Sequence, residues 1–379
     1  MLPKQTSTHS WKTLLTACTL LAGLSVFAVQ AHAADVTLSG FMSIAGGKVL
    51  NGNGSEPIID TPCPCFVNDW YNMGTYNSSW SWRPESRIGI RLNGKMTDSL
   101  SGVMQIDASD TRYRSGPTLE WAYLGWRPLG SDWEVNLGRK RLPIYYYSDF
   151  SDVGFAYPWV RPPQELYGWE INNFNGATIV HHGQLGSIST RGSVFFGRED
   201  SHDNAFMAYW YGVNDKPDVS WSNITGADIE FSRDWFNVRL VYIQSNVYVA
   251  SLSDGVLADG GQQIYGISAN IDYNNWLVRS EYSYFDRWKE LGYRSNAYMA
   301  GVGYHFGSLT PMLTYSYFSD VSADGTPTWK NSNTSLTLRY DLNSQSDIKV
   351  QYDQYRELSA PGSTSGNANV ISVSYDRVF

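Results

Sequence analysis

Apolar and polar residues alternate along most of the chain from Asp35 to Phe379, in segments of about ten residues. In the segment 265–273, tyrosine, isoleucine and alanine occupy the odd positions, and glycine, serine, asparagine and aspartate occupy the even ones. A period of two places successive side chains on opposite faces of a β-strand. The pattern therefore predicts sixteen strands, which begin near residues 35, 83, 100, 119, 132, 173, 187, 222, 235, 262, 275, 294, 308, 331, 347 and 368.

The connections between these segments alternate between long and short. Long connections are expected at 46–82, 111–118, 140–172, 199–221, 247–261, 287–293, 319–330 and 358–366. Short ones are expected at 95–99, 128–131, 182–187, 233–234, 273–274, 307–308 and 343–346. Long loops at one end of the strands and tight turns at the other are typical of an all-β, antiparallel up-and-down transmembrane barrel.

A soluble β-sandwich or propeller would also contain many short strands, with its apolar face inside. Two observations favour the membrane barrel. The first is an N-terminal export signal, described below. The second is the position of aromatic residues near segment ends, where an interfacial girdle would lie: Trp235, Tyr273, Trp276, Tyr282 and Tyr284.

The N-terminus has the features of a secretory signal peptide. Two lysines precede the apolar run 14–29, which is followed by Ala31-His32-Ala33, a small-x-small cleavage pattern. We assign residues 1–33 to the signal peptide and 34–379 to the barrel. Removal of the leader and its two lysines changes the net charge from -8 to -10.

Composition narrows the choice of partners. The chain has 28 Lys and Arg against 36 Asp and Glu, so no basic excess is available to neutralise nucleic-acid phosphates. Cys63 and Cys65 are the two cysteines outside the leader, and in an oxidising compartment they form a local disulfide or remain a free pair. They are too few for a zinc site, and we expect neither a metal nor a cofactor.

In a membrane barrel the apolar face meets lipid, so the polar face lines the lumen. By this rule we expect five charged residues to line the pore: Arg239, Arg279, Glu281, Arg339 and Lys349. Buried unpaired charges are costly, which favours a wet lumen and hence a channel. The alternative is that the lumen charges pair with one another and plug the barrel, as in narrower barrels. A barrel of sixteen strands is wide enough to leave an aqueous bore, which favours the channel.

Three stretches resemble the Gram-negative general porins. Residues 86–107, from Ser-Arg-Ile-Gly-Ile-Arg to Gln-Ile-Asp, resemble their second and third strands. Residues 123–139, which end in Leu-Gly-Arg, resemble the fourth and fifth. The terminal segment 372–379 resembles the outer-membrane assembly signal, with Tyr375 and Phe379 at matching positions and Arg377 departing from the pattern.

This resemblance implies a homotrimer of sixteen-stranded barrels in the outer membrane, in contact with lipid and lipopolysaccharide. It also implies that the third outer loop, 140–172, folds inward and sets carboxylates against arginines on the wall. By position, Asp149 and Asp152 would be the loop carboxylates and Arg87 and Arg91 the wall cations. We assign two further wall residues to the same constriction: Asp107 and Glu120. The family's Pro-Glu-Phe-Gly-Gly loop signature is absent, and Glu120 stands where an arginine is common.

The implied function is passive diffusion of ions and small hydrophilic solutes through a water-filled pore. A solute-specific channel of the same fold and a surface adhesin or receptor barrel are the alternatives. Cation or anion preference stays open. An enzyme is not expected. His202 lies in an expected outer loop and is interpreted as a solvated residue. The other histidines outside the leader fall at expected periplasmic turns: His181, His182 and His305. No phosphate-binding loop or His-Glu-x-x-His motif is present.

Overall fold

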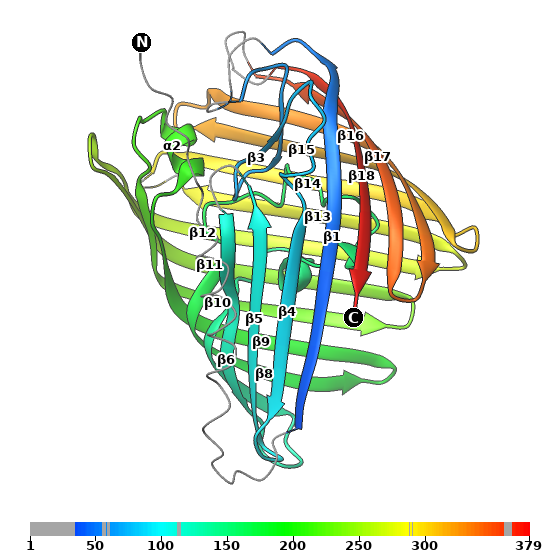
Figure 1. Ribbon diagram of the computed structural model, residues 1–379. Coiled ribbons are helices and arrows are strands. Elements are labelled where there is room, and N and C mark those ends of the chain that lie inside the picture. The colour runs from blue at the N-terminus through cyan, green and yellow to red at the C-terminus, as the bar shows by residue number, and fades with distance from the viewer. Residues whose placement is uncertain are drawn as a thin grey trace, which may run out of the picture. The chain divides into compact units, whose positions relative to one another are not determined.

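The computed structural model describes residues 35–54, 58, 61–111, 115–287, 289, 291–359 and 366–379. The predicted signal peptide lies outside these residues. Within them, sixteen antiparallel strands form a closed barrel (Figure 1), with β18 hydrogen-bonded to β1. The barrel strands are β1 (Asp35–Gly52), β4 (Arg87–Lys95), β5 (Leu100–Asp110), β6 (Ser115–Trp126), β7 (Trp133–Arg141), β8 (Asn173–Leu185), β9 (Ile188–Ser201), β10 (Asp218–Arg233), β11 (Phe236–Ser251), β12 (Gly255–Tyr273), β13 (Trp276–Arg287), β14 (Tyr293–Tyr304), β15 (Leu309–Ser322), β16 (Pro327–Asn343), β17 (Ser346–Glu357) and β18 (Ala368–Val378).

The predicted fold class is confirmed, and every predicted segment corresponds to one barrel strand. The largest difference in position is at β12, which begins at Gly255 rather than near 262. Its early residues continue the ladder with β11, as in the pair Tyr248 and Asp259. This part of β12 contains three glycines and three consecutive apolar residues, 256–258, so its pairing with β11 does not show as alternation of apolar and polar residues.

Tight turns close one end of the barrel. Asn274 and Asn275 form the two-residue connection between β12 and β13, and both have positive φ, 47° and 68°. Asparagine adopts this left-handed backbone more readily than most residues, and its twist matches that of a two-residue hairpin. The sequence of this turn therefore helps to fix the register of β12 and β13.

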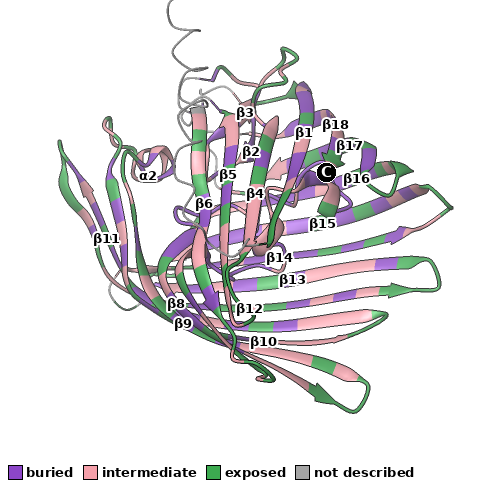
Figure 2. Ribbon diagram, turned by 60° about the horizontal axis from the view of Figure 1, so that its bottom comes forward, coloured by how far each residue is buried: buried purple, intermediate pink, exposed green. Residues whose placement is uncertain are grey.

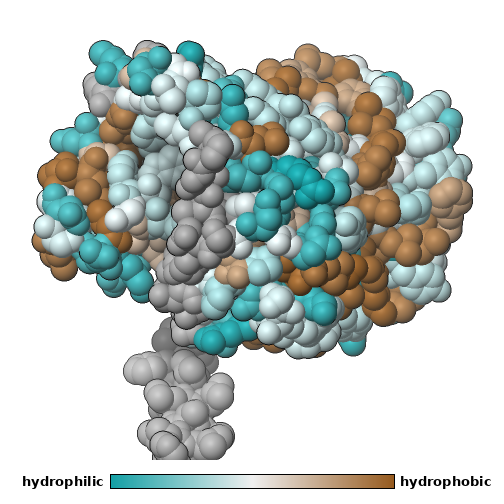
Figure 3. All heavy atoms as spheres, turned by 90° about the horizontal axis from the view of Figure 1, so that it is seen from above, coloured by the Kyte–Doolittle hydropathy of each residue, from teal (hydrophilic) through white to brown (hydrophobic). Residues whose placement is uncertain are grey.

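The outer face of the wall is apolar. Buried and exposed positions alternate along the strands (Figure 2); on β4, for example, Ile88 and Ile90 are exposed on either side of the buried Gly89. Hydrophobic residues form patches along the sides of the barrel (Figure 3). Exposed aromatic residues pack together near the tight turns, for example Trp235 with Tyr273, whose ring centroids are 5.8 Å apart. A wall with its apolar side chains outward matches a lipid environment.

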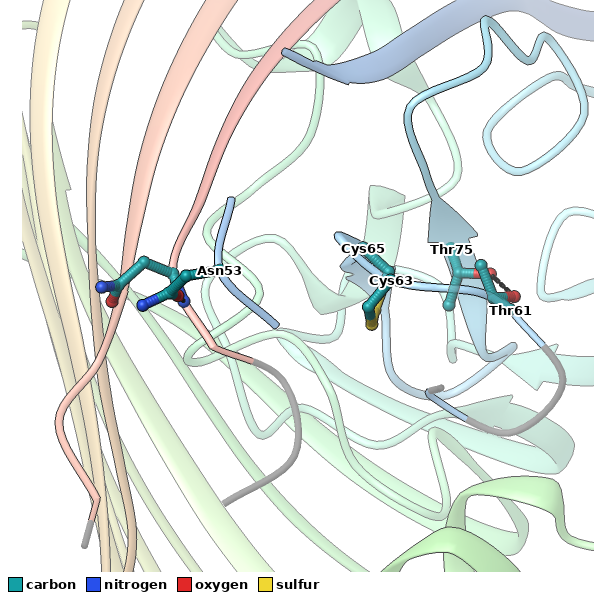
Figure 4. The surroundings of a disulfide bond; sticks show 6 residues. Asn53, Thr61, Cys63, Cys65 and Thr75 are labelled. Carbon is teal, nitrogen blue, oxygen red and sulfur yellow. Dashed lines mark hydrogen bonds between the residues drawn. A yellow bond between two sulfur atoms is a disulfide. The ribbon is translucent and has the colours of Figure 1, made fainter. Parts of the chain in front are cut away.

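Long loops fill much of the barrel interior. The loop after β1 carries a small hairpin, β2 (Phe66–Asp69) and β3 (Gly74–Tyr76), and a disulfide between Cys63 and Cys65 (Figure 4). The loop 142–172 contains two short 3-10 turns, η2 (Ser148–Phe150) and η3 (Gly154–Ala156). A short helix, α2 (Ala205–Tyr211), lies in the loop between β9 and β10. Among the described residues, no helix is long and apolar enough to cross a membrane.

Candidate pore constriction

The loop 142–172, here called the inner loop, crosses the lumen and binds the wall at many points. On β13, Glu281 accepts hydrogen bonds from the Tyr146 backbone N–H (3.0 Å) and from the Tyr167 hydroxyl (2.5 Å). On β11, Arg239 donates to the backbone oxygen of Tyr145 at 3.2 Å. The Arg279 Nε donates to the Tyr147 hydroxyl at 3.0 Å. These wall residues therefore hold residues 145–147 and Tyr167 of the inner loop.

The middle of the inner loop binds another part of the wall, β16 and β17. Arg339 on β16 donates to the backbone oxygens of Phe155 (2.9 Å) and Tyr157 (3.1 Å). Lys349 on β17 donates to the Gly154 oxygen at 2.7 Å and pairs with Asp376 on β18 at 2.9 Å. Backbone and side-chain contacts on both sides of the lumen make the inner loop a fixed partition.

Arg161 of the inner loop makes two buried ion pairs. Its Nε lies 2.6 Å from Glu85 of the first outer loop, and its Nη1 lies 2.8 Å from Asp353 on β17. All three side chains are no more than 5% exposed. The guanidinium also stacks near the rings of Phe66 and Tyr76 in the β2–β3 hairpin. Arg161 thus connects the inner loop, the first outer loop and the barrel wall.

Five charged residues meet between the inner loop and the wall formed by β4 to β7, and we call them the Asp152 cluster. Asp152 of the inner loop contacts Arg141 directly, and its Oδ1 lies 3.7 Å from Arg87. Arg141 also lies 3.0 Å from Glu120, and Asp107 is within hydrogen-bonding reach of Asp152. The cluster holds two cations and three carboxylates across the gap between loop and wall.

The charges around Asp152 determine its ionisation. Burial alone would raise the pKa of the Asp152 carboxyl, but the adjacent guanidinium groups of Arg141 and Arg87 outweigh this effect and lower the pKa. Asp152 is therefore ionised at neutral pH. A lowered pKa also means that its contribution to the cluster is lost only under acidic conditions, below the ordinary range of an aspartate.

A polar cavity of about 100 Å³ lies beside the Asp152 cluster. The first outer loop, the inner loop and the walls of β4, β5 and β6 all contribute to its lining. All five cluster residues line it, together with small polar groups such as Ser109 and Thr118. The cavity is thus a polar space whose boundary is formed by opposite charges.

The structure brings together four of the six residues that we assigned to the constriction: Arg87, Asp107, Glu120 and Asp152. The other two, Arg91 and Asp149, lie outside the Asp152 cluster. Arg91 stacks on the Trp121 ring at 5.1 Å from its centroid. Asp149 lies within electrostatic reach of Lys140 and Tyr123. Arg91 and Asp149 therefore belong to a neighbouring part of the lumen.

The five residues assigned to the pore lining lie on the inner face, where they contact the inner loop or other wall charges. The expectation that lumen charges face free water is wrong for Arg239 and Lys349, which are 4% and 0% exposed. Their charges are instead compensated by backbone oxygens and by carboxylates, such as Asp228 for Arg239 and Asp376 for Lys349.

Sequence reasoning missed three important cations: Arg141, Arg161 and Arg287. Arg141 belongs to β7, because the inner loop begins at 142 rather than 140. Arg287 on β13 pairs with the fully buried Glu170 of the inner loop at 2.5 Å. The sequence contained one signal for these ion pairs. Isolated charges occur within the aromatic and proline-rich stretch 142–172, and charged residues need partners when they are buried.

At the C-terminus, Phe379 exchanges backbone hydrogen bonds with Gly40 of β1, at 2.8 and 2.9 Å. Phe379 is exposed, and the Tyr375 side chain belongs to the partly exposed outer set of β18 positions. The residues of the predicted assembly signal thus lie on the outer face of the strand that closes the barrel. Their recognition role stays a prediction.

A closed barrel with an apolar exterior and a loop across its lumen defines the class of outer-membrane channels. The model of the family described as Gram-negative porin matches residues 17–378. The chain therefore belongs to the Gram-negative porins, and the predicted resemblance is confirmed at the level of the family. It is an outer-membrane channel for the diffusion of small solutes.

Solved structures share this fold at low sequence identity. The channel DcaP of Acinetobacter baumannii has a TM-score of 0.60 at 15% identity, over 91% of this chain and 97% of that chain. Salmonella typhi OmpF, in complex with daunomycin, has a TM-score of 0.57 at 13% identity, over 91% and 97%. An anion-selective porin from Comamonas acidovorans has a TM-score of 0.57 at 12% identity, over 92% and 100%. No curated protein sequence matches the chain.

Proposed function

We propose that ions and small hydrophilic solutes cross the barrel through the polar cavity, and that the Asp152 cluster is the narrowest point of this route. The observation that carries the proposal is the placement of Arg87, Arg141 and Asp152 across the gap between loop and wall. Fixed charges in a narrow bore concentrate ions of opposite sign, which sets selectivity without a binding reaction. Arg91, Lys140 and Asp149 would then act on ions that have passed the cluster.

Removing one charge from the constriction is expected to shift ion selectivity in a direction set by its sign. One unit charge about 4 Å from a passing ion contributes ~1 kcal/mol even in water, or roughly fivefold in local ion concentration. We therefore expect Asp152→Asn and Asp149→Asn to move the reversal potential toward anion preference. Arg87→Ala and Arg91→Ala should move it toward cation preference. Reversal potentials in a salt gradient across a planar bilayer measure both effects.

The matched control for these variants is Asp254→Asn, which removes a carboxylate from an exposed outer turn between β11 and β12. Screening by salt should leave its reversal potential close to that of the wild type. Equal shifts from the control and the constriction variants, or shifts of the wrong sign, would contradict the proposed route.

A solute-specific channel is the second candidate. The observation that favours it is the number of wall contacts made by the inner loop, which leave a small, fixed passage. A series of neutral solutes of increasing size distinguishes the two candidates in liposome swelling assays. Flux that declines smoothly with size supports a general pore, whereas saturation by one solute class at millimolar concentration supports a specific channel.

We also propose that the chain is exported by a cleaved signal peptide and assembles as a homotrimer surrounded by lipid and lipopolysaccharide. One structural neighbour at 10% identity, with a TM-score of 0.53, is described as the trimer form of Vibrio cholerae OmpT. We infer that the chain has no enzymatic activity. His202 supports this inference, because it is largely exposed and pairs with Asp218 at 3.1 Å rather than with a serine nucleophile.

A further inference from the structure

An aromatic pocket lies at the loop end of the barrel, on a different part of the inner loop from the Asp152 cluster. The first outer loop, the inner loop, α2 and the strands β15 and β16 all contribute to it. Its aromatic walls are formed by Trp70, Trp169, Phe206, Trp210, Phe318 and Trp329. These rings pack against one another, with centroids of Trp70 and Trp329 4.7 Å apart and those of Trp210 and Trp329 5.4 Å apart. Ring faces of this kind attract cations.

Glu165 of the inner loop lines this pocket and lacks a cationic partner. It is 5% exposed, and its Oε2 accepts a hydrogen bond from Ser316 at 2.8 Å. Its Oε1 has no hydrogen-bond partner. The Gln164 side chain lies within reach of the carboxylate, but no Lys or Arg of the described residues forms an ion pair with it. Other buried carboxylates of the inner loop and its surroundings have such partners: Glu85 and Asp353 pair with Arg161, and Glu170 pairs with Arg287. Burial raises the pKa of Glu165 to about 7.

Two further acceptor oxygens in the pocket lining are unpaired within the described part of the chain, the Gln164 Oε1 and the Asn331 Oδ1. Together with the Glu165 Oε1 they make three acceptors, which is the number that the three N–H bonds of a primary ammonium group require. The Trp169 Nε1 is an unpaired donor in the same lining.

The size of the pocket limits its occupant. The free space is about 20 Å³, enough for a group of roughly the size of water. A sugar ring or a quaternary ammonium is too large, whereas a terminal ammonium fits. Arg287 lies near the pocket, with its guanidinium 4.9 Å from the Trp169 ring centroid. Its charge is matched by Glu170 at 2.5 Å, so it does not offset the charge that Glu165 carries when ionised.

We propose that this aromatic pocket binds the primary ammonium end of a small organic solute, with Glu165 as its counter-ion. The site belongs to a different surface from the constriction and does not depend on whether the barrel conducts.

Calorimetric titration of the mature protein in detergent micelles tests the proposal. The probes are ethanolammonium, n-propylammonium, tetramethylammonium, potassium and neutral n-propanol, all at constant ionic strength. We expect ethanolammonium and n-propylammonium to bind through their common ammonium group, and the other three not to bind at this site. Glu165→Gln, which keeps the shape of the side chain, should weaken ammonium binding by about tenfold or more.

Two further variants complete the design. Asn331→Leu removes one acceptor on the wall and should weaken binding independently of Glu165. Asp203→Asn replaces an exposed carboxylate on an outer loop at a left-handed position that asparagine tolerates, and it should leave binding unchanged. Unchanged binding in folded Glu165→Gln, or equal binding of potassium or tetramethylammonium, would overturn the proposal. Since binding is measured without ion flow, failure here leaves the proposed channel function intact, and absence of conductance leaves this proposal intact.

Discussion

Replacing Arg161 by alanine is expected to cost about 3–5 kcal/mol of unfolding free energy. The substitution leaves Glu85 and Asp353 buried without a cation, at positions where Arg161 now lies 2.6 and 2.8 Å away. It also removes the guanidinium that packs against Phe66 and Tyr76 of the β2–β3 hairpin. Because these contacts join two loops to the wall, we expect the loops to loosen before the barrel strands separate.

Denaturant unfolding of the refolded protein, followed by tryptophan fluorescence, measures this effect. Arg198→Ala is the matched control, because Arg198 forms an exposed ion pair with Asp200 at a similar distance of 2.8 Å. Exposed pairs contribute about 0–1 kcal/mol, so the control should be almost neutral. Similar losses for the two variants would show that the buried pairs of Arg161 do not stabilise the folded protein.

The second large effect is expected from releasing the inner loop. Replacing residues 148–158 by glycine and serine at equal length removes Asp152 from its cluster and the packing of Tyr157 and Phe155. The chain length is retained, so the strands on either side, β7 and β8, are not strained. A flexible segment no longer holds a fixed partition across the lumen, and single-channel conductance should increase several-fold.

A control variant separates loop release from general disturbance of the barrel. Glycine and serine placed at 252–254, an exposed turn between β11 and β12, should leave single-channel conductance unchanged. Circular dichroism of both proteins checks that the β-sheet content is retained. A folded inner-loop variant with wild-type conductance would mean that another part of the barrel limits ion flow.

The barrel could be predicted from the sequence because its determinants are local. Alternation such as Ile348, Val350 and Tyr352 against Lys349 and Gln351 follows from one face meeting lipid and the other meeting the interior. Turn residues such as Asn274 and Asn275 mark the connections. Each of these signals is contained within about ten residues, so sequence alone specifies the strands and their order.

The interior could not be predicted in the same way, because its contacts join residues far apart in the chain. Arg161 and Asp353 form an ion pair although they lie 192 residues apart in the sequence, and no periodic pattern connects them. A parity argument shows that Arg239 and Lys349 point inward, but it cannot show that backbone oxygens of the inner loop bind them. The helix α2 was missed because seven residues give too short a pattern to distinguish from a loop.

The central claim is that ions pass through the polar cavity beside the Asp152 cluster. Thiol modification of Ser109→Cys during single-channel recording tests it most directly, because Ser109 lines this cavity and cysteine differs little in size. Attachment of a negatively charged thiol reagent should reduce the current by more than half, and the exposed outer-turn variant Ser253→Cys should be unaffected. A conducting, labelled Ser109→Cys protein with unchanged current, or a folded and inserted wild-type barrel without current, would contradict the account.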